Sequence, residues 1–204
     1  MISKLDEKYW SDRYRNNDFG WDTGAITNPL KKYFDQLSNK EISILIPGAG
    51  NAYEAEYLVN NGFTNVYVCD LSEEPLKNLK KRCPAFKNEN LLLLDFFKLR
   101  QSPFEQSALT FDLIVEQTFF CALNPSLRKK YFEKMSTLLN PGGRLVGVLF
   151  DDVLNKDHPP FGGNKEEYLA YIDSSFKIKT FEKCYNSIKP RENRELFINL
   201  VRTV

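Results

Sequence analysis

Residues 42–51, Ile-Ser-Ile-Leu-Ile-Pro-Gly-Ala-Gly-Asn, begin a pattern that ends at Val66-Tyr-Val-Cys-Asp70. The run 42–46 is short, apolar and followed by proline and glycine, as in a strand that is buried on both faces of a parallel sheet. Small and apolar residues between 52 and 59 then recur with helical spacing, and Gly62 is a favourable helix end. A second β-branched run stops at Asp70. The stretch therefore predicts a strand–helix–strand unit.

Two features of this unit predict a nucleoside-binding site. Gly48 and Gly50 form a turn without side chains, so that a ligand can approach the backbone there. Asp70 stands twenty positions after Gly50, at the tip of the second strand, where a carboxylate accepts from the two hydroxyls of a ribose. The third glycine of a dinucleotide site is replaced by Tyr53, and no Gly-Lys-Ser/Thr phosphate loop follows. These residues favour a neutral or cationic adenosyl ligand, against the alternative that the glycine turn only packs.

Composition excludes several classes of function. A chain of 204 residues suits one domain, and 28 basic against 27 acidic residues leave a net charge of +1 that calls for no polyanionic partner. No apolar run has the length of a signal region or a membrane span. The cysteines, which form no Cys-x-x-Cys pair or cysteine–histidine cluster, are Cys69, Cys83, Cys121 and Cys184. We therefore expect a cytoplasmic protein with free thiols, a small-molecule substrate, no metal, and no nucleic-acid or membrane partner; its oligomeric state is not predicted.

The first 38 residues form a leader that is rich in aromatic residues. Trp10 and Tyr14 lie four positions apart in a predicted helix over 5–15 and share one of its faces. Trp21 follows in a loop, so both tryptophans of the protein lie in this leader. One interpretation is a helix that caps the core. The other is a lid over the ligand, because an aromatic ring facing a cation gains about 1–2 kcal/mol when water is excluded.

Downstream segments continue the alternation of strands and helices. Asn140-Pro-Gly-Gly143 predicts a turn, and the long loop 151–163 contains the only histidine, His158. No helical pattern separates the last two runs, 176–185 and 196–204, so we expect an antiparallel hairpin. The other predicted elements are strands at 91–94, 111–116 and 144–150, a helix that Ser72 caps, and helices at 28–37, 124–139 and 164–172.

Four segments together resemble one family: Tyr9-Trp-Ser-Asp-Arg-Tyr14, Gly20-Trp-Asp22, Phe119-Phe-Cys-Ala-Leu-Asn-Pro125 and His158-Pro-Pro-Phe161. They are similar to the thiopurine methyltransferase-like family of class I S-adenosylmethionine-dependent methyltransferases, which includes halide and thiol methyltransferases. The resemblance implies a three-layer α/β/α Rossmann-like fold with a seven-stranded, mostly parallel sheet whose last strand is antiparallel. It also implies one domain over 1–204, with a lid leader at 1–38 and a core at 39–204.

The resemblance implies S-adenosylmethionine as cofactor, S-adenosylhomocysteine as product, and transfer of a methyl group to a thiol, halide, thiocyanate or thiopurine-like sulfur. The implied cofactor-binding residues are Trp10, Tyr14, Trp21, Gly48, Gly50, Asp70, Leu71, Asp95, Phe96 and Gln117. The implied acceptor-binding residues are Phe19, Phe119, Phe120, His158 and Phe161. Two of these assignments have alternatives: Asp95 can instead cap the next turn, and some of the aromatic rings can be core.

Two positions depart from the family pattern. Gln117 stands where the thiopurine branch carries arginine, and Pro47 stands where many class I enzymes carry an acid. The segment after the fourth strand is closer to the halide and thiol branch. No catalytic residue is predicted, because a soft nucleophile such as a thiol, with a pKa of about 8.5, needs little help from a base.

Several other interpretations compete with this one. The chain can be a cofactor-binding module without turnover, or a methyltransferase for another small molecule. A nucleic-acid methyltransferase is disfavoured, because Glu116-Gln-Thr-Phe119 replaces the Asn/Asp-Pro-Pro-aromatic turn of amino-methylating enzymes. Cys121 is disfavoured as a nucleophile, because no histidine precedes it in the sequence. Arg191 and Arg194 are expected to be exposed surface charges.

Overall fold

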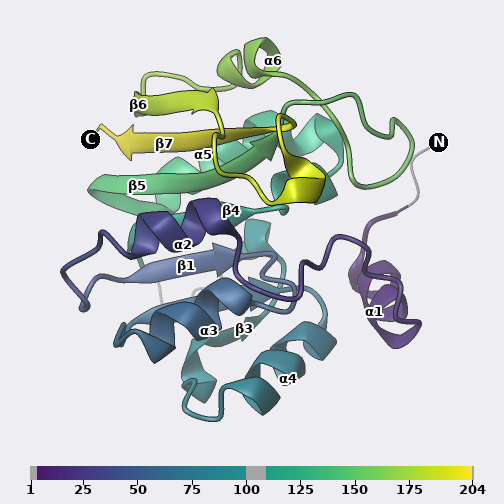
Figure 1. The fold of residues 1–204 in the computed structure, drawn as a ribbon, viewed down its shortest axis with the longest axis vertical. Coiled ribbons are helices and arrows are strands. Elements are labelled where there is room, and N and C mark those ends of the chain that lie inside the picture. The colour runs from purple at the N-terminus through teal and green to yellow at the C-terminus, as the bar shows by residue number, and fades with distance from the viewer. Residues whose placement is uncertain (1–3, 100–108, 204) are drawn as a thin grey trace. The chain divides into compact units, whose positions relative to one another are not determined.

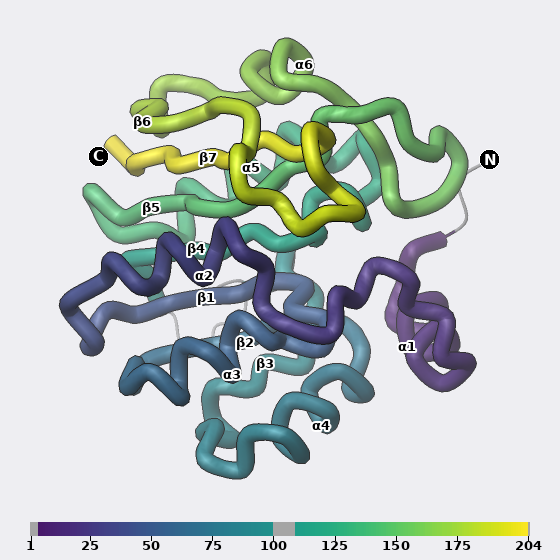
Figure 2. The backbone as a smooth tube through the Cα atoms, in the orientation of Figure 1, coloured from purple at the N-terminus to yellow at the C-terminus, as the bar shows by residue number. Residues whose placement is uncertain are grey.

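A computed structural model of the protein describes residues 4–99 and 109–203. The chain forms two compact units, one that comprises residues 4–109 and one that begins at Thr110. Figure 1 shows their helices and strands, and Figure 2 traces the backbone. No helix in these described ranges combines the length and the apolar character that a bilayer span requires.

The first unit contains a parallel sheet with helices packed on it. Its strands, in the order β3-β2-β1, are β1 (Ile44–Pro47), β2 (Val66–Asp70) and β3 (Leu91–Leu93). Its helices are α1 (Glu7–Arg15), α2 (Asn28–Phe34), α3 (Tyr53–Asn60) and α4 (Glu73–Arg82), with 3-10 turns η1 (Asn88–Asn90) and η2 (Phe96–Lys98). The predicted strand–helix–strand unit is thus confirmed as β1-α3-β2.

The burial of these elements follows their sequence pattern. The residues of β1 are all buried, as predicted for a strand covered on both faces. Ala55 and Leu58 of α3 are fully buried, and Val59 beside them is half-buried. Ser72 caps α4 by accepting a hydrogen bond from the backbone N–H of Glu74 at 3.4 Å. The carboxyl end of β1 therefore leads into the start of α3, and the carboxyl end of β2 leads into the start of α4.

The second unit contains a mixed sheet with the strand order β4-β5-β7-β6. Its strands are β4 (Phe111–Gln117), β5 (Leu139–Phe150), β6 (Phe176–Lys183) and β7 (Glu195–Arg202). Its helices are α5 (Arg128–Leu138) and α6 (Lys165–Leu169), with 3-10 turns η3 (Phe120–Ala122), η4 (Pro125–Leu127) and η5 (Lys189–Arg191). β4 and β5 are parallel, whereas β7 runs antiparallel to β5 and to β6.

The described ranges contain seven strands, and the predicted fold class is confirmed: the sheet is mixed and its last strand is antiparallel to both neighbours. Two local predictions need correction. The predicted turn 140–143 is part of β5, where it forms an irregularity in the pairing between Phe111 and Leu113. The predicted helix 124–139 begins with η4, whose cap is Asn124, and becomes α-helical only at Arg128. Val204, predicted to end the last strand, lies outside the described residues.

Candidate functional site

Asp70 ends β2 and is held by backbone donors from two other segments. Its Oδ2 accepts the N–H of Gly50 at 3.3 Å, and its Oδ1 accepts the N–H of Ser72 at 2.9 Å. Burial raises the pKa of this carboxyl to about 6, although the N–H donors favour the ionised form. A carboxylate has about four lone-pair positions, so two further donors can still bind. The side chain is therefore fixed in place and retains the capacity to bind two hydroxyl groups.

The glycine turn after β1 requires residues without side chains. Gly48 and Gly50 have φ angles of +56° and +53°, in the left-handed region. The N–H of Gly48 donates to the carbonyl of Cys69 at 2.7 Å, which ties the turn to β2. A Cβ on Gly50 would lie 3.4 Å from Tyr14 Oη and 3.8 Å from Trp21 Nε1. Aromatic side chains of the leader therefore border the space that a Cβ on Gly50 would fill.

These side chains belong to an aromatic leader cluster, which we define as Trp10, Tyr14, Phe19 and Trp21. Trp10 and Trp21 meet edge to face with their ring centroids 5.7 Å apart. Tyr14 stacks on Phe19 at 5.7 Å and meets Trp21 edge to face at 5.8 Å. Burial raises the pKa of the Tyr14 hydroxyl well above its ordinary value, and the nearby Asp70 charge adds to this, while a hydrogen bond from Trp21 opposes it. The hydroxyl is thus neutral at physiological pH.

The leader is anchored beside Asp70. Ser11 of α1 forms a buried hydrogen bond with Ser72, Oγ to Oγ, at 2.9 Å. Arg15 forms an ion pair with Glu74 at 3.3 Å. Figure 1 shows α1 beyond the carboxyl end of β1. This is the arrangement that the lid interpretation requires, since the leader lies at the edge where β1 and β2 end.

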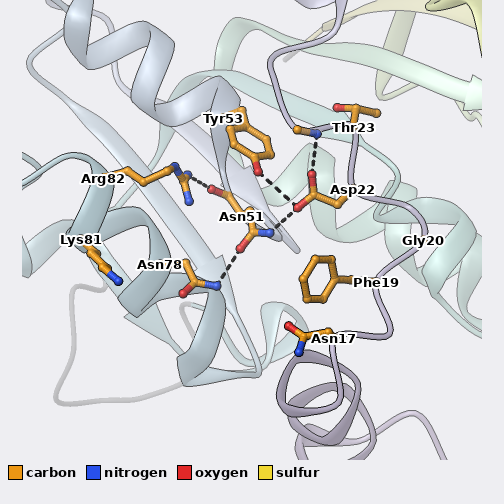
Figure 3. Close-up of a pocket in the computed structure, with 11 residues that line it drawn as sticks. Asn17, Phe19, Gly20, Asp22, Thr23, Asn51, Tyr53, Asn78, Lys81 and Arg82 are labelled. Atoms are coloured by element: carbon orange, nitrogen blue, oxygen red, sulfur yellow. Dashed lines mark hydrogen bonds between the residues drawn. The ribbon is translucent and has the colours of Figure 1, made fainter.

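A chain of polar side chains links the leader loop to the glycine turn (Figure 3). The side chain of Asn51 donates to Asp22, and its oxygen accepts from Asn78 of α4 at 2.9 Å. Tyr53 donates to the same oxygen of Asp22 at 3.4 Å. Phe19 lines a pocket of about 930 Å³ beside this chain. Asp22 and Asn51 were not predicted as site residues; the signals were the Gly20-Trp-Asp22 motif and the position of Asn51 directly after the turn.

The residues predicted on the adenine side lie after β2 and β3. Leu71 directly follows Asp70, and its backbone N–H favours the ionised form of that carboxyl and so lowers its pKa. Asp95 accepts the N–H of Phe97 at 2.9 Å and so caps η2, as its alternative interpretation states. Phe96 is buried and meets Phe97 edge to face at 5.3 Å. A contact of Asp95 and Phe96 with adenine stays a prediction.

The predicted residues of the second unit differ in exposure. Gln117 and Phe119 are half-buried at the carboxyl end of β4. Phe120 and Phe161 are both 1% exposed, and Phe120 packs edge to face with Tyr131 at 4.9 Å. These two rings belong to the core of the second unit. His158 is exposed, and its Nδ1 lies 2.9 Å from the carbonyl oxygen of Pro159.

The buried cysteine and arginine of the second unit have structural surroundings. Burial raises the pKa of the Cys121 thiol to about 12, so the thiol is protonated at neutral pH and is a poor nucleophile. The expectation of an exposed Arg191 is wrong: it is buried, lies 3.5 Å from Glu195 and stacks over Phe150. Its long side chain buries its stem while the carboxylate balances its charge. Arg194 is exposed, as expected, and pairs with an aspartate of the loop 151–163.

Glu116 is a fully buried acid one position before Gln117. Its Oε1 accepts the backbone N–H groups of Phe119 at 2.8 Å and Phe120 at 2.9 Å, and its Oε2 accepts the hydroxyl of Tyr131 at 2.7 Å. Burial raises its pKa to about 7. The sequence pattern placed this residue at the end of a strand and in the segment Glu116-Gln-Thr-Phe119. It did not reveal the hydrogen bonds of Glu116, because no local spacing shows which segments approach it.

Comparisons with known proteins identify the family of the chain. The family model for thiopurine S-methyltransferase matches residues 5–203. A probable thiol methyltransferase 2 of Arabidopsis thaliana is 28% identical, over 96% of this chain and 85% of that protein. Thiocyanate methyltransferase 1 of Brassica oleracea is 25% identical, over 94% of this chain and 83% of the relative.

A solved structure supports the fold. The 1,6-didemethyltoxoflavin-N1-methyltransferase of Burkholderia thailandensis, solved with S-adenosylhomocysteine, has a TM-score of 0.75 and 15% identity, over 97% of this chain and 87% of that one. Because the family model covers nearly the whole chain, the protein belongs to the thiopurine S-methyltransferase family.

Proposed function

We propose that this protein is an S-adenosylmethionine-dependent methyltransferase that methylates a small soft nucleophile, such as a thiol or thiocyanate, and that its two units form one methyltransferase domain. The observation that carries the proposal is the meeting of Gly50 with Asp70, Tyr14 and Trp21 in a chain of this family. A backbone turn, a ribose-binding acid and an aromatic cover are the parts that a cationic adenosyl cofactor needs.

The residues of the first unit fit such a cofactor. Asp70 has lone pairs left for two ribose hydroxyls, and the turn at Gly48 and Gly50 presents backbone instead of side chains. When bound, S-adenosylmethionine supplies a methyl group activated by the positive sulfonium. Trp10 and Trp21 place electron-rich rings in the leader, where they would attract that charge and exclude water.

The proposed acceptor needs positioning more than proton transfer. Thiolates and thiocyanate carry their own electron pair, and alignment alone can lower a barrier by about 7–11 kcal/mol. Charge is neutralised as a sulfonium reacts with an anion, so a site that excludes water favours the reaction. Phe119, half-buried after β4, is the aromatic residue of the second unit that best suits an acceptor contact.

The cysteine spacing supports the further proposal of a cytoplasmic location.

A panel of acceptors tests the proposal. We would measure S-adenosylhomocysteine binding by isothermal titration calorimetry, then incubate the protein with methyl-labelled S-adenosylmethionine and hydrosulfide, thiophenol, thiocyanate, iodide or 6-mercaptopurine. The proposal predicts binding, and labelled product with at least one sulfur acceptor. Binding without turnover on any acceptor would instead identify a cofactor-binding module, and absence of binding would contradict the site itself.

A further inference from the structure

The segment directly after β4 makes a strained bend. Thr118 has a φ angle of +59°, which is unfavourable for a β-branched residue because its side chain crowds the backbone. Such a conformation persists only where the surrounding structure holds it, and it is enriched at ligand sites. The half-buried residues of this bend are Gln117, Thr118 and Phe119. They lie at the carboxyl end of a parallel strand, where open α/β sheets bind ligands.

Glu116 holds both ends of this bend. It belongs to β4, and its Oε1 accepts the N–H groups of Phe119 at 2.8 Å and Phe120 at 2.9 Å, so the carboxylate closes the backbone around Gln117 and Thr118. The Cys121 thiol adds a hydrogen bond to the carbonyl of Thr118 at 3.2 Å. The direction in which the bend presents its side chains therefore depends on this one carboxylate.

Two neighbouring elements fix Glu116 in turn. Tyr131, fully buried in α5, donates its hydroxyl to Oε2 at 2.7 Å. On β5, a Cβ at Gly147 would lie 2.4 Å from the Cβ of Glu116, so a glycine is needed for the strands to pair there. Both carboxylate oxygens are used by donors of the protein, and the side chain is fully buried. Glu116 is thus arranged to orient backbone rather than to take a proton from a substrate.

We propose that Glu116, held by Tyr131, is a positioning residue for methyl transfer: it fixes the bend that presents Gln117 and Phe119 at the carboxyl end of β4. This inference rests on the proposed function. The strained Thr118 supports it, because a bend needed only to connect β4 to η3 would not require an unfavourable backbone conformation. An oriented bend contributes to rate through alignment, and a misplacement of about 1 Å can cost about 100-fold.

The test compares variants by turnover per cofactor site. Glu116→Gln keeps an oxygen for both N–H groups and offers an amide to the Tyr131 oxygen, whereas Glu116→Asp is one methylene too short to serve all three donors. Tyr131→Phe removes a single donor and leaves Glu116 in place. Glu133→Gln is the matched control, because Glu133 is exposed on α5 and lies 4.0 Å from Lys129. For each variant, calorimetric titration with S-adenosylhomocysteine counts the folded sites, and a labelled-methyl assay with thiocyanate or thiophenol gives kcat and KM.

The inference predicts that Glu116→Asp lowers kcat per site by about 10- to 100-fold, that Glu116→Gln restores most of it, and that the control is unchanged. Equal kcat per site in Glu116→Asp and wild type, with only a lower melting temperature, would overturn it and leave a structural role. A loss of kcat per site in Glu116→Gln as large as that in Glu116→Asp would also overturn it.

If Glu116→Asp does not bind S-adenosylhomocysteine, Tyr131→Phe decides: a lower kcat per site supports the inference and an unchanged one refutes it. Absence of wild-type turnover contradicts the proposed function, and this inference with it, whereas an active wild type with unaffected variants refutes the inference alone.

Discussion

Gly50 donates its backbone N–H to the carboxylate of Asp70 at 3.3 Å, so the turn after β1 and the acid at the end of β2 form one unit. A Cβ on the same glycine would lie 3.4 Å from the hydroxyl of Tyr14 and 3.8 Å from the indole nitrogen of Trp21. One residue thus binds the acid predicted to hold ribose and borders the aromatic leader predicted to cover it.

Replacement of Gly50 by alanine tests the close packing of the turn. The new Cβ would lie 3.4 Å from Tyr14 Oη, and the φ of +53° is strained for alanine, so we expect a loss of about 1–2 kcal/mol in the free energy of unfolding. Binding of S-adenosylhomocysteine should weaken as well. Denaturant titration and calorimetry measure the two effects.

Two alanine controls separate strain from crowding. Gly62→Ala has a φ of +86° and nothing within 4 Å of the new Cβ, so it adds strain alone. Gly20→Ala has neither a positive φ nor a close neighbour. If Gly62→Ala weakened cofactor binding as much as Gly50→Ala, the contact with the leader would not be the cause.

The ionisation of Asp70 predicts a pH dependence of cofactor binding. Its pKa is about 6 in the protein without ligand, and ribose hydroxyls donate to the ionised form, so binding should lower that pKa and release a proton near pH 6. The affinity for S-adenosylhomocysteine should be constant above about pH 7 and fall as the pH drops below about 6. Calorimetry in buffers of different ionisation enthalpy measures both the affinity and the proton release.

Asp70→Asn provides the control for this titration, since the amide keeps the shape and cannot ionise. The affinity of Asp70→Asn for S-adenosylhomocysteine should be lower than that of wild type at every pH. It should also not fall further as the pH drops below about 6. An identical step in wild type and Asp70→Asn would assign the pH dependence to another group.

The link between Asp22 and Asn51 predicts how tightly the leader is held. Asp22→Ala removes the acceptor for Asn51 and Tyr53, and the leader should then open more often. Both tryptophans lie in the leader, so their fluorescence reports its environment. We expect faster proteolysis of the leader in Asp22→Ala, and a fluorescence change on addition of S-adenosylhomocysteine in the wild type.

Asp12→Ala is the matched control, because Asp12 lies on α1 and its half-exposed side chain pairs with Lys8 of the same helix. Equal proteolysis rates in Asp12→Ala and Asp22→Ala would show that the link to the glycine turn does not hold the leader.

The buried Glu116 predicts a dependence of stability on pH. Its pKa is about 7 when folded, against an ordinary value of 4.5, so it binds a proton more tightly in the folded state. Its contribution therefore favours folding below about pH 4.5 and is lost as the pH rises to about 7. The free energy of unfolding of Glu116→Gln minus that of wild type should therefore rise by about 1–3 kcal/mol as the pH increases from about 5 to about 8. Denaturant titrations at these pH values decide, and a constant difference would contradict the raised pKa.

Sequence patterns predicted most of the fold because they act locally. The apolar run of β1, the cap at Ser72 and the absence of a helix before β7 each follow from residues close in sequence. The segment 140–143 was harder: Asn-Pro-Gly-Gly favours a turn, and the pairing of β5 with β4 passes from Leu139 directly to Arg144, so these residues form an irregularity inside β5. The local preference for a bend persists there, but within a strand that continues on both sides.

The site residues that belong to a short sequence motif could be predicted. Those whose role depends on a contact between distant parts of the sequence could not. Gly50 and Asp70 follow from spacing, and their proximity is observed. The bond between Ser11 and Ser72 joins residues 61 positions apart. Burial of Arg191 depends on a pairing with Glu195 and a ring that no short pattern reveals.

Cofactor binding should depend most directly on Asp70, the acid proposed to bind the ribose. The deciding measurement is the affinity for S-adenosylhomocysteine of wild type and Asp70→Ala, with folding of the variant checked by circular dichroism. Loss of two hydrogen bonds to a carboxylate, at about 1.5–3 kcal/mol each, predicts an affinity at least about 100-fold lower. An unchanged affinity in the folded variant would contradict the account.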